Sequence, residues 1–241
     1  MAASLTNNDY AERRSEKQSP PKSSLAVIGA RVQYYRSSVP WFGLVPQILF
    51  DVLAKMKIFV IPYHLVAEGM RNAGPQPAAG KFAEYEFGFL GPQDMPAIAG
   101  IPGRELSLPH LLSRLQQGKL CFGAKYRGEI VAFTWWNLTE GTIWSHHVFP
   151  LGEREAFLFD AYTLERFRGM GIAPYLRYRC YEELAKLGRE QCYSITAVWN
   201  PPAAKFKKKL GARVLELGVF VNLFHRWAFH RRLRDYTGGR Q

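Results

Sequence analysis

The feature that most restricts the fold of this chain is a glycine-rich junction between an apolar run and an amphipathic run. The apolar run, residues 156–164, reads AFLFDAYTL, and the amphipathic run, residues 174–188, reads PYLRYRCYEELAKLG. The first composition favours a strand, and the second repeats apolar residues at helical spacing. The predicted apolar face of the helix consists of Leu176, Cys180, Leu184 and Leu187. The junction, RGMGIA at residues 168–173, therefore predicts a strand that enters a helix through a tight turn.

The segments around this junction predict further strands and helices. A hairpin is expected over residues 119–138, with its turn at Arg127-Gly128. The other expected elements are strands at 82–90, 141–151 and 192–199, helices at 106–118 and 201–211, and one or two closing strands over 212–227. Antiparallel strands that precede a strand–helix–strand–helix–strand order predict an α/β fold with a mixed sheet.

The two ends of the chain differ in composition from this central part. Residues 1–24 are rich in Ser, Pro, Lys and Glu and predict a disordered tail. Residues 25–80 predict an N-terminal extension in which residues 46–56 form an amphipathic helix. That helix either packs on its own domain or gives residues 41–66 a peripheral contact with a membrane surface or a partner. A folded domain over 81–228 and a basic C-terminal tail over 229–241 complete the expected organisation.

The positive charge of the chain is concentrated near its C-terminus. The formal net charge is +12, and residues 200–241 hold ten Lys and Arg against two Asp and Glu, a net of +8. This excess suits anionic partners such as a phosphate-bearing cofactor, an anionic membrane surface or nucleic acid. Nucleic acid is not favoured, because no zinc-finger or helix-turn-helix pattern accompanies the charge.

The cysteines and the apolar runs give expectations about compartment. Cys121, Cys180 and Cys192 are scattered and have no metal-binding spacing, so we expect free thiols and no metal. No secretory signal is visible, and no apolar run reaches the roughly 18 residues that a transmembrane helix needs. We therefore expect a cytoplasmic protein, at most peripheral at the inner membrane face.

The glycine junction has features that favour the binding of an anion. The start of a helix leaves backbone N–H groups without partners and carries a partial positive charge. Small residues allow a ligand to approach these groups closely, and Arg168 adds a cation. The junction therefore predicts either a cradle for a phosphate group or a tight turn without a ligand. It matches neither the dinucleotide fingerprint nor the nucleoside-triphosphate loop, because the glycine spacing and the Gly-Lys-Ser/Thr sequence are lacking.

The junction resembles motif A of the GCN5-related N-acetyltransferase (GNAT) superfamily. The pattern of that motif is Arg/Gln-x-x-Gly-x-Gly/Ala, and Arg168, Gly171 and Ala173 match it. The resemblance implies a GNAT-like α/β fold with a mixed, splayed β-sheet flanked by helices, preceded here by the N-terminal helical extension.

A second segment downstream is similar to another signature of the same family. In VWNPPAAKFKKKLGAR, residues 198–213, an Asn after a strand opens a short helix that ends in Leu-Gly. Asn200, Leu210 and Gly211 match that signature, whereas Ala212 replaces the usual aromatic residue. The two signatures follow each other in the family's order, which strengthens the resemblance.

The resemblance implies acetyl-CoA or another acyl-CoA as co-substrate, without a metal. The backbone of the junction would bind the CoA pyrophosphate through Arg168, Gly169, Met170, Gly171, Ile172 and Ala173. Ala161 and Thr163, near the end of the preceding strand, would pair with the pantetheine arm, to which Asn200 would also bond. The Lys205–Lys209 cluster, which includes Lys207, would either lie near the CoA phosphates or form an ordinary solvated helix face.

Candidate catalytic residues come from the strand before the junction and from a histidine pair. Asp160 and Tyr162 are two residues apart and are expected on one strand face, where an acid serves as base in some relatives. His147 is a further candidate for the substrate cleft. Many relatives carry a tyrosine acid seven residues after the Asn, and Lys207 stands there instead. We expect Lys207 to face solvent rather than to replace that acid.

The sequence thus predicts a CoA-dependent N-acyltransferase, most simply an N-acetyltransferase. Direct attack by an amine on the thioester would transfer the acyl group to a small molecule, a sugar or a peptide. Two alternatives keep the fold: an acyltransferase that uses acyl-carrier protein or acts on lipids, and a catalytically degenerate module that only binds CoA.

Overall fold

The computed structural model describes residues 53, 58–70, 79–102, 104, 106–143, 147–224 and 226–237. The chain divides into two units, residues 1–56 and 57–241, and nearly all described residues belong to the second. The predicted tail at 1–24 and the core of the amphipathic helix at 46–56 lie outside the described residues, apart from Leu53.

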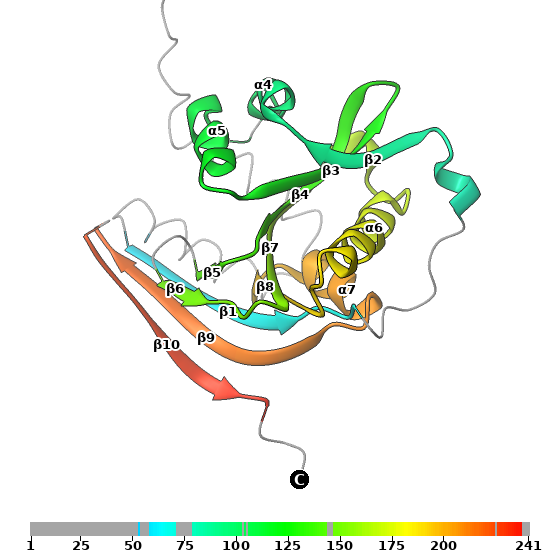
Figure 1. Ribbon diagram of the computed structural model, residues 1–241. Coiled ribbons are helices and arrows are strands. Elements are labelled where there is room, and N and C mark those ends of the chain that lie inside the picture. Colours follow the sequence, from blue (N-terminus) through cyan, green and yellow to red (C-terminus); the bar gives the residue numbers. More distant parts are fainter. Residues whose placement is uncertain are drawn as a thin grey trace, which may run out of the picture. The chain divides into compact units, whose positions relative to one another are not determined.

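The described strands form one large mixed sheet and one small one (Figure 1). The large sheet has the strand order β10-β9-β1-β8-β7-β4-β3-β2 among the described residues. Its strands are β1 (Ile58–Ala67), β2 (Tyr85–Leu90), β3 (Leu120–Tyr126), β4 (Glu129–Asn137), β7 (Glu155–Thr163), β8 (Gln191–Ala197), β9 (Arg213–Leu223) and β10 (Trp227–Asp235). Every pairing is antiparallel except that of β7 with β8, which α6 (Ile172–Lys186) connects. The predicted mixed, splayed sheet flanked by helices is confirmed.

Helices cover both faces of the sheet around β3, β4 and β7 (Figure 1). Helix α6 packs on one face, while α4 (Met95–Ala99) and α5 (Leu108–Gln116) pack on the other. The alternation of side chains along β4 explains both cores, since Trp136 enters the first and Trp135 the second. Both tryptophans are fully buried. Helix α7 (Pro201–Lys209) lies beside α6 and precedes β9.

The remaining short elements are 3₁₀ turns and a small hairpin. The turns are η2 (Ala79–Phe82), η3 (Pro92–Asp94) and η4 (Glu165–Phe167). Strands β5 (Glu140–Ile143) and β6 (His147–Pro150) pair antiparallel as a separate sheet. The prediction of one strand over 141–151 was therefore wrong, because the chain folds back on itself within that run.

Strands β7 and β8 separate at their carboxyl ends. They pair only from Glu155 to Phe157 and from Gln191 to Tyr193, after which β8 pairs with β1 instead. Beyond this point β7 carries a β-bulge, in which Asp160 and Ala161 together oppose Thr134 of β4. The wedge between the two carboxyl ends is the kind of crevice in which open α/β sheets bind ligands.

Two expected domain boundaries differ from the structure. Strand β1 was assigned to the N-terminal extension, yet it lies between β8 and β9 in the sheet. Strand β10 includes residues that were assigned to the basic C-terminal tail. In both places pairing with a neighbouring strand supplies backbone hydrogen bonds that local composition does not reveal, and an edge strand tolerates charged side chains. The apolar face of α6 is also shorter than expected, because Leu187 is 49% exposed just after the helix ends.

The end of β1 approaches the end of α7 very closely at Gly69. A Cβ atom at this position would lie 2.0 Å from the backbone oxygen of Leu210. Gly88 in β2 has open space around its would-be Cβ. We expect Gly69→Ala to lower the free energy of unfolding by about 2 kcal/mol or more, because backbone atoms must move apart.

Urea denaturation measures this change, with Gly88→Ala as the matched control. The control should be neutral or slightly more stable than the wild-type chain. Equal denaturation midpoints for the two variants would contradict the close contact between β1 and α7.

Candidate active site

The glycine loop lies between β7 and helix α6, as its sequence predicts. Turn η4 leads into Gly169 and Gly171, which have φ angles of 80° and 86°. Only glycine adopts this left-handed conformation without strain, and Gly171 is the N-cap of α6. The backbone N–H groups of Ile172 and Ala173 belong to the first helical turn, where the helix itself offers no acceptor. The loop is solvent-exposed from residue 168 to 170, so an anion has access to it.

Two cationic side chains stand at this loop. Arg168 is held against the end of β7, where its Nε donates to the carbonyl of Thr163 at 3.2 Å and its Nη1 pairs with Glu165. Lys81 reaches the loop from η2, and its Nζ lies 3.9 Å from the position of a Cβ on Gly171. Sequence reasoning missed Lys81, because it is far away along the chain and belongs to no motif. Both charges favour an anion at the helix terminus.

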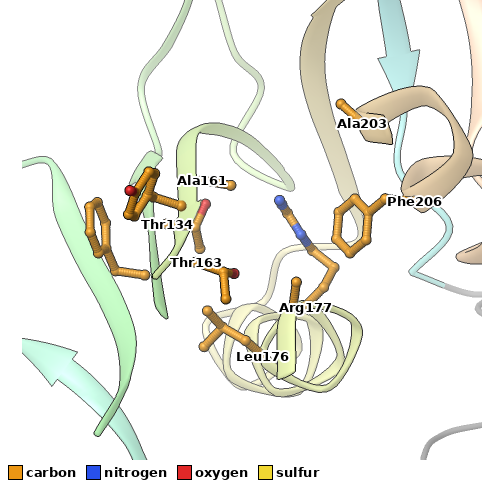
Figure 2. Close-up of a pocket in the computed structure, with 10 residues that line it drawn as sticks. Thr134, Ala161, Thr163, Leu176, Arg177, Ala203 and Phe206 are labelled. Atoms are coloured by element: carbon orange, nitrogen blue, oxygen red, sulfur yellow. The ribbon is translucent and has the colours of Figure 1, made fainter. Parts of the chain in front are cut away.

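A cavity of about 190 Å³ opens next to the loop, in the wedge beside β7 (Figure 2). Ala161, Tyr162 and Thr163 line it from β7, and Arg177 from α6. Phe206 closes it from α7. Ala173 belongs both to this lining and to the glycine loop, so cradle and cavity adjoin. The predicted site residues Ala161, Tyr162, Thr163 and Ala173 are thus brought together.

The structure places Asp160 in a double ion pair. Its two carboxylate oxygens accept from Nη2 of Arg104 at 2.5 Å and from Nη1 of Arg114 at 2.6 Å. These arginines come from the α4–α5 side of the sheet, where both guanidinium groups also lie over aromatic rings. Asp160 does not line the cavity. The carboxylate that was predicted as a base therefore joins the bulge of β7 to helix α5.

Tyr162 and His147 occupy different positions. Tyr162 shares the strand side of Asp160, since its ring lies 4.6 Å from the guanidinium carbon of Arg104, and it lines the cavity. His147 begins β6, in the small sheet, and its side chain lies outside the described structure. Tyr162 is therefore the predicted catalytic residue that the structure places at the cavity.

Asn200 and Lys207 act differently from each other on helix α7. The Oδ1 atom of Asn200 accepts from the backbone N–H of Ala203 at 3.2 Å, so the side chain caps the helix. Its amide nitrogen is the group that can donate to a ligand. Lys207 was expected to face solvent, and this was wrong. It is 7% exposed, and its Nζ donates to the carbonyl of Ile195 on β8 at 3.1 Å.

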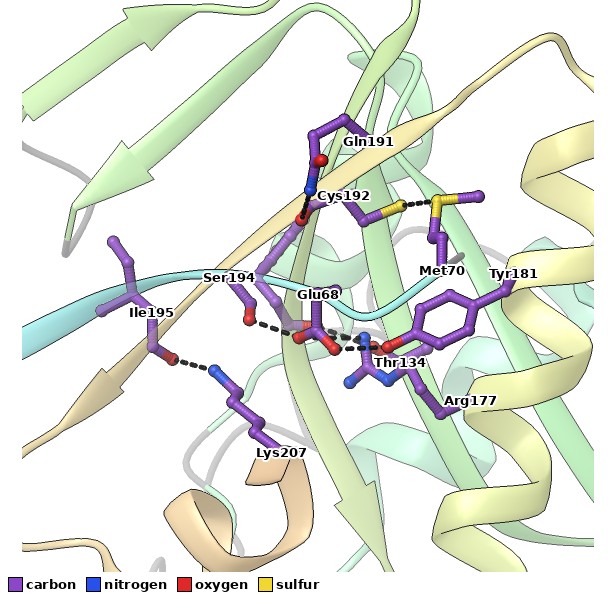
Figure 3. A network of polar contacts seen from close by, with 11 residues as sticks. Glu68, Met70, Thr134, Arg177, Tyr181, Gln191, Cys192, Ser194, Ile195 and Lys207 are labelled. Carbon is purple, nitrogen blue, oxygen red and sulfur yellow. Dashed lines mark hydrogen bonds and ion pairs between the residues drawn. The ribbon is translucent and has the colours of Figure 1, made fainter. Parts of the chain in front are cut away.

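Lys207 belongs to a buried polar network beside the cavity (Figure 3). Glu68, directly after β1, accepts hydrogen bonds from the hydroxyls of Tyr181 and Ser194 and pairs with Arg177 at 3.8 Å. Burial acts to raise the pKa of Glu68, but Arg177, Lys207 and the two hydroxyls together lower it. The sequence offers no motif for this network, because its members come from four separate elements.

Lys207 is the cation of this network that loses its proton most easily. Burial lowers its pKa to about 8, and the attraction of Glu68 only partly offsets burial and the repulsion by Arg177. Other buried groups nearby remain neutral, since burial raises the pKa of Cys180 to about 12 and that of Cys192 still further. All three cysteines of the chain are buried free thiols.

Comparison with known proteins agrees with this arrangement. Residues 99–212 match the model of the acetyltransferase (GNAT) family. The matched family is the one that the two sequence signatures resemble. The match includes the glycine loop, the cavity-lining strand β7 and helix α7. No curated protein matches the chain. In the described residues, no helix is long and apolar enough to span a membrane, and no cluster of His, Cys, Asp or Glu is arranged to hold a metal.

Solved structures similar to this chain have low sequence identity to it. A Drosophila protein is 16% identical, with a TM-score of 0.52, over 75% of this chain and 57% of that protein. A fungal GCN5-related glucosamine N-acetyltransferase region is 16% identical, with a TM-score of 0.48, over 77% of this chain and 22% of that protein. The Escherichia coli ribosomal-protein-S18-alanine N-acetyltransferase is 20% identical, with a TM-score of 0.43, over 53% of this chain and 76% of that protein. At these identities the likeness concerns the fold.

The double ion pair of Asp160 predicts a structural role that can be measured. Asp160→Asn should lower the free energy of unfolding by about 1–3 kcal/mol, because two largely buried guanidinium groups lose their carboxylate. Glu129→Gln is the control, since its ion pair with Arg166 is exposed and should contribute less than about 1 kcal/mol. Chemical denaturation of both variants checks the difference. Wild-type stability of Asp160→Asn would contradict the role.

The depressed pKa of Lys207 predicts a dependence of stability on pH. The unfolded chain binds a proton at Lys207 up to about pH 10.5, but the folded chain releases it above about pH 8. Protonation therefore favours unfolding, and the wild-type protein loses up to about 3 kcal/mol of stability from this group as the pH falls through that window. As the pH falls through this window, the free energy of unfolding of Lys207→Met should therefore rise by the same amount relative to that of the wild type.

Denaturation at several pH values between these limits measures the gain. Lys208→Met is the control, because Lys208 is exposed on the same helix, and its difference from the wild type should not change with pH. A constant difference for Lys207→Met as well would show that the pKa of Lys207 is the same in the folded and the unfolded chain, so that the fold does not depress it.

Proposed function

We propose that this protein transfers an acyl group from acyl-CoA, most simply acetyl-CoA, to the nitrogen of an amine. The observation that carries this proposal is the continuity between the glycine loop at the start of α6 and the cavity in the wedge beside β7. An anion cradle that adjoins a narrow, mainly apolar cavity suits a ligand with phosphates at one end and an uncharged arm at the other. The family of residues 99–212 supports the same reading.

The residues at this site fit such a ligand. We assign the phosphates to the backbone of residues 168–173, with Lys81 and Arg168 as the nearby cations. Because β7 pairs with β8 only as far as Phe157, the backbone from Ala161 to Thr163 has no strand partner on the β8 side, where the uncharged arm can bond. The amide of Asn200 stands at the start of α7 as a further donor.

The protein's contribution to the transfer is mainly positioning. Acyl-CoA supplies a thioester whose carbonyl carbon accepts the amine. Holding both reactants in the wedge makes the attack effectively unimolecular, which can account for much of the barrier. Tyr162 is at the cavity to orient the reacting groups, whereas both oxygens of Asp160 are occupied by arginines. We assign proton removal from the amine to water or to a residue near the acceptor, with His147 as a candidate.

The acceptor site is proposed on the opposite side of the β7 end. A second cavity of about 440 Å³ lies there between η3, α4 and the β3–β4 turn. Asp94 and Glu129 lie in its lining, where they pair with Lys125 and Arg166. An amine on a small molecule, a sugar or a peptide would replace these cations as the partner of a carboxylate. Transfer from acyl-carrier protein is the second candidate for the donor, because the exposed lysines of α7 would favour an acidic carrier.

Calorimetric titration with acetyl-CoA tests the cradle. Gly171→Glu should weaken binding by about a hundredfold or more, because it places a carboxylate and a strained backbone where the phosphates bind. Gly188→Glu is the matched control: Gly188 has a φ of 73° at the other end of α6, and its variant should bind like the wild type.

The titration also separates the alternatives. Equal loss in both variants would attribute the effect to strain rather than to the cradle. Binding of acetyl-CoA without turnover on any amine would favour a CoA-binding module. Transfer from acyl-carrier protein, with no binding of acyl-CoA, would favour the carrier-dependent enzyme.

A further inference from the structure

The buried network beside the cavity has more positive than negative charge. Glu68 is its single carboxylate among the described residues, and it faces two cations, Arg177 and Lys207. The side chain of Glu68 is fully buried and that of Arg177 is 5% exposed. With both cations protonated, the network carries one net positive charge in a region that excludes water.

The other titratable groups around Arg177 do not balance this charge. Tyr181 and Cys180 lie on its own helix and Cys192 on β8, and burial raises the pKa of all three further above neutral pH, so they remain uncharged. The remaining polar neighbours, Ser194 on β8 and Thr134 on β4, carry no charge. All elements packed against Arg177 therefore leave the excess charge in place near neutral pH.

Arg177 is the charged member of the network that lines the cavity. Its guanidinium group enters the space between Thr163 and Phe206 (Figure 2), with its central carbon 5.7 Å from the Phe206 ring. The Nη1 atom of Arg177 is buried and has no hydrogen-bond partner in the described structure, apart from the long ion pair with Glu68. This Nη1 atom is on the side of Glu68, whereas the guanidinium group as a whole lines the cavity, where its charge would attract an anion.

We propose that Arg177, which pairs with Glu68, is the binding group for an anion in this cavity, and that this anion is the thiolate of CoA. The assignment to CoA rests on the proposed function; the need for an anion rests on the network alone. A thiolate forms when acyl transfer is complete: the bond from carbon to nitrogen forms, the bond from carbon to sulfur breaks, and its electron pair stays on sulfur. Free CoA reaches the same state by releasing its thiol proton to solvent.

The proposal explains how the wedge can function without a tyrosine at residue 207. Lys207 does not line the cavity and does not need to donate a proton to sulfur. Its charge adds to that of Arg177 and stabilises negative charge on the leaving sulfur by preorganised electrostatics. Arg177 touches the reacting atom, whereas Glu68 acts through it as a positioning residue and Lys207 contributes only its charge.

The test compares the binding of CoA with that of desulfo-CoA, which lacks the thiol, by calorimetry from about pH 6 to pH 8. We expect the preference for CoA to increase by about tenfold over this range, because the site favours the thiolate, whereas phosphate binding affects both ligands equally. A thiol-specific alkylating reagent should also react with bound CoA at lower pH than with free CoA, unless the site shields the sulfur. The ratio of affinities is therefore the deciding measurement.

Variants at Arg177 identify the group responsible. Arg177→Met should abolish the pH dependence of the affinity ratio but should still bind desulfo-CoA. Arg177→Lys should retain part of the pH dependence. Arg179→Met is the control, since Arg179 pairs with Glu182 away from the cavity, and it should behave like the wild type. If Arg177→Met does not fold, the wild-type ratio and Arg177→Lys still decide the question.

The outcomes distinguish this proposal from the proposed function. Binding of both ligands with a ratio that does not change with pH would overturn the thiolate site and leave CoA-dependent transfer standing. A pH-independent preference for succinyl-CoA over butyryl-CoA would overturn it too, because Arg177 would then bind a carboxylate. Failure of the protein to bind any CoA compound would overturn both proposals.

Discussion

The separation of β7 from β8 is the constraint on which the rest of this structure depends. Parallel strands that stay paired leave no room between their carboxyl ends, whereas these two diverge after Phe157 and Tyr193. The divergence opens the wedge, and the bulge at Asp160 and Ala161 turns the end of β7 toward it. The same strand end leads into the glycine loop, so the start of α6 lies next to the wedge. Cradle and cavity are thus two consequences of one break in strand pairing.

A buried network fills the base of the wedge and ties distant parts of the chain together. Glu68 follows β1, Ser194 lies on β8, Arg177 and Tyr181 lie on α6, and Lys207 lies on α7. Such a network contributes specificity only when its members are satisfied, and it is costly wherever a charge stays unpaired. Glu68 has several partners, whereas the excess charge is left on the side of the cavity. The net positive charge of the network thus lies beside the cavity, where an anionic ligand would neutralise it.

The elements that the sequence predicted are those whose signals are local. The hairpin turns at Arg127-Gly128, α6 begins after Gly171, and Asn200 caps α7, because turns and caps depend on a few neighbouring residues. The misplaced elements depend on pairing with remote segments. Strand β1 was assigned to an extension because its partners β8 and β9 come more than a hundred residues later.

The sequence by itself determined the strand and helix on either side of the glycine loop, the left-handed glycines of the loop and the kind of ligand that such a loop suits. These features follow from backbone conformations that only certain residues adopt and from periodicities within single elements. The tertiary structure alone decided that Asp160 is held by Arg104 and Arg114, and that Lys81 reaches the loop. It likewise decided that Lys207 is buried against Glu68 and Arg177. Burial and charge pairing depend on which distant groups the fold brings together, and no local pattern encodes that.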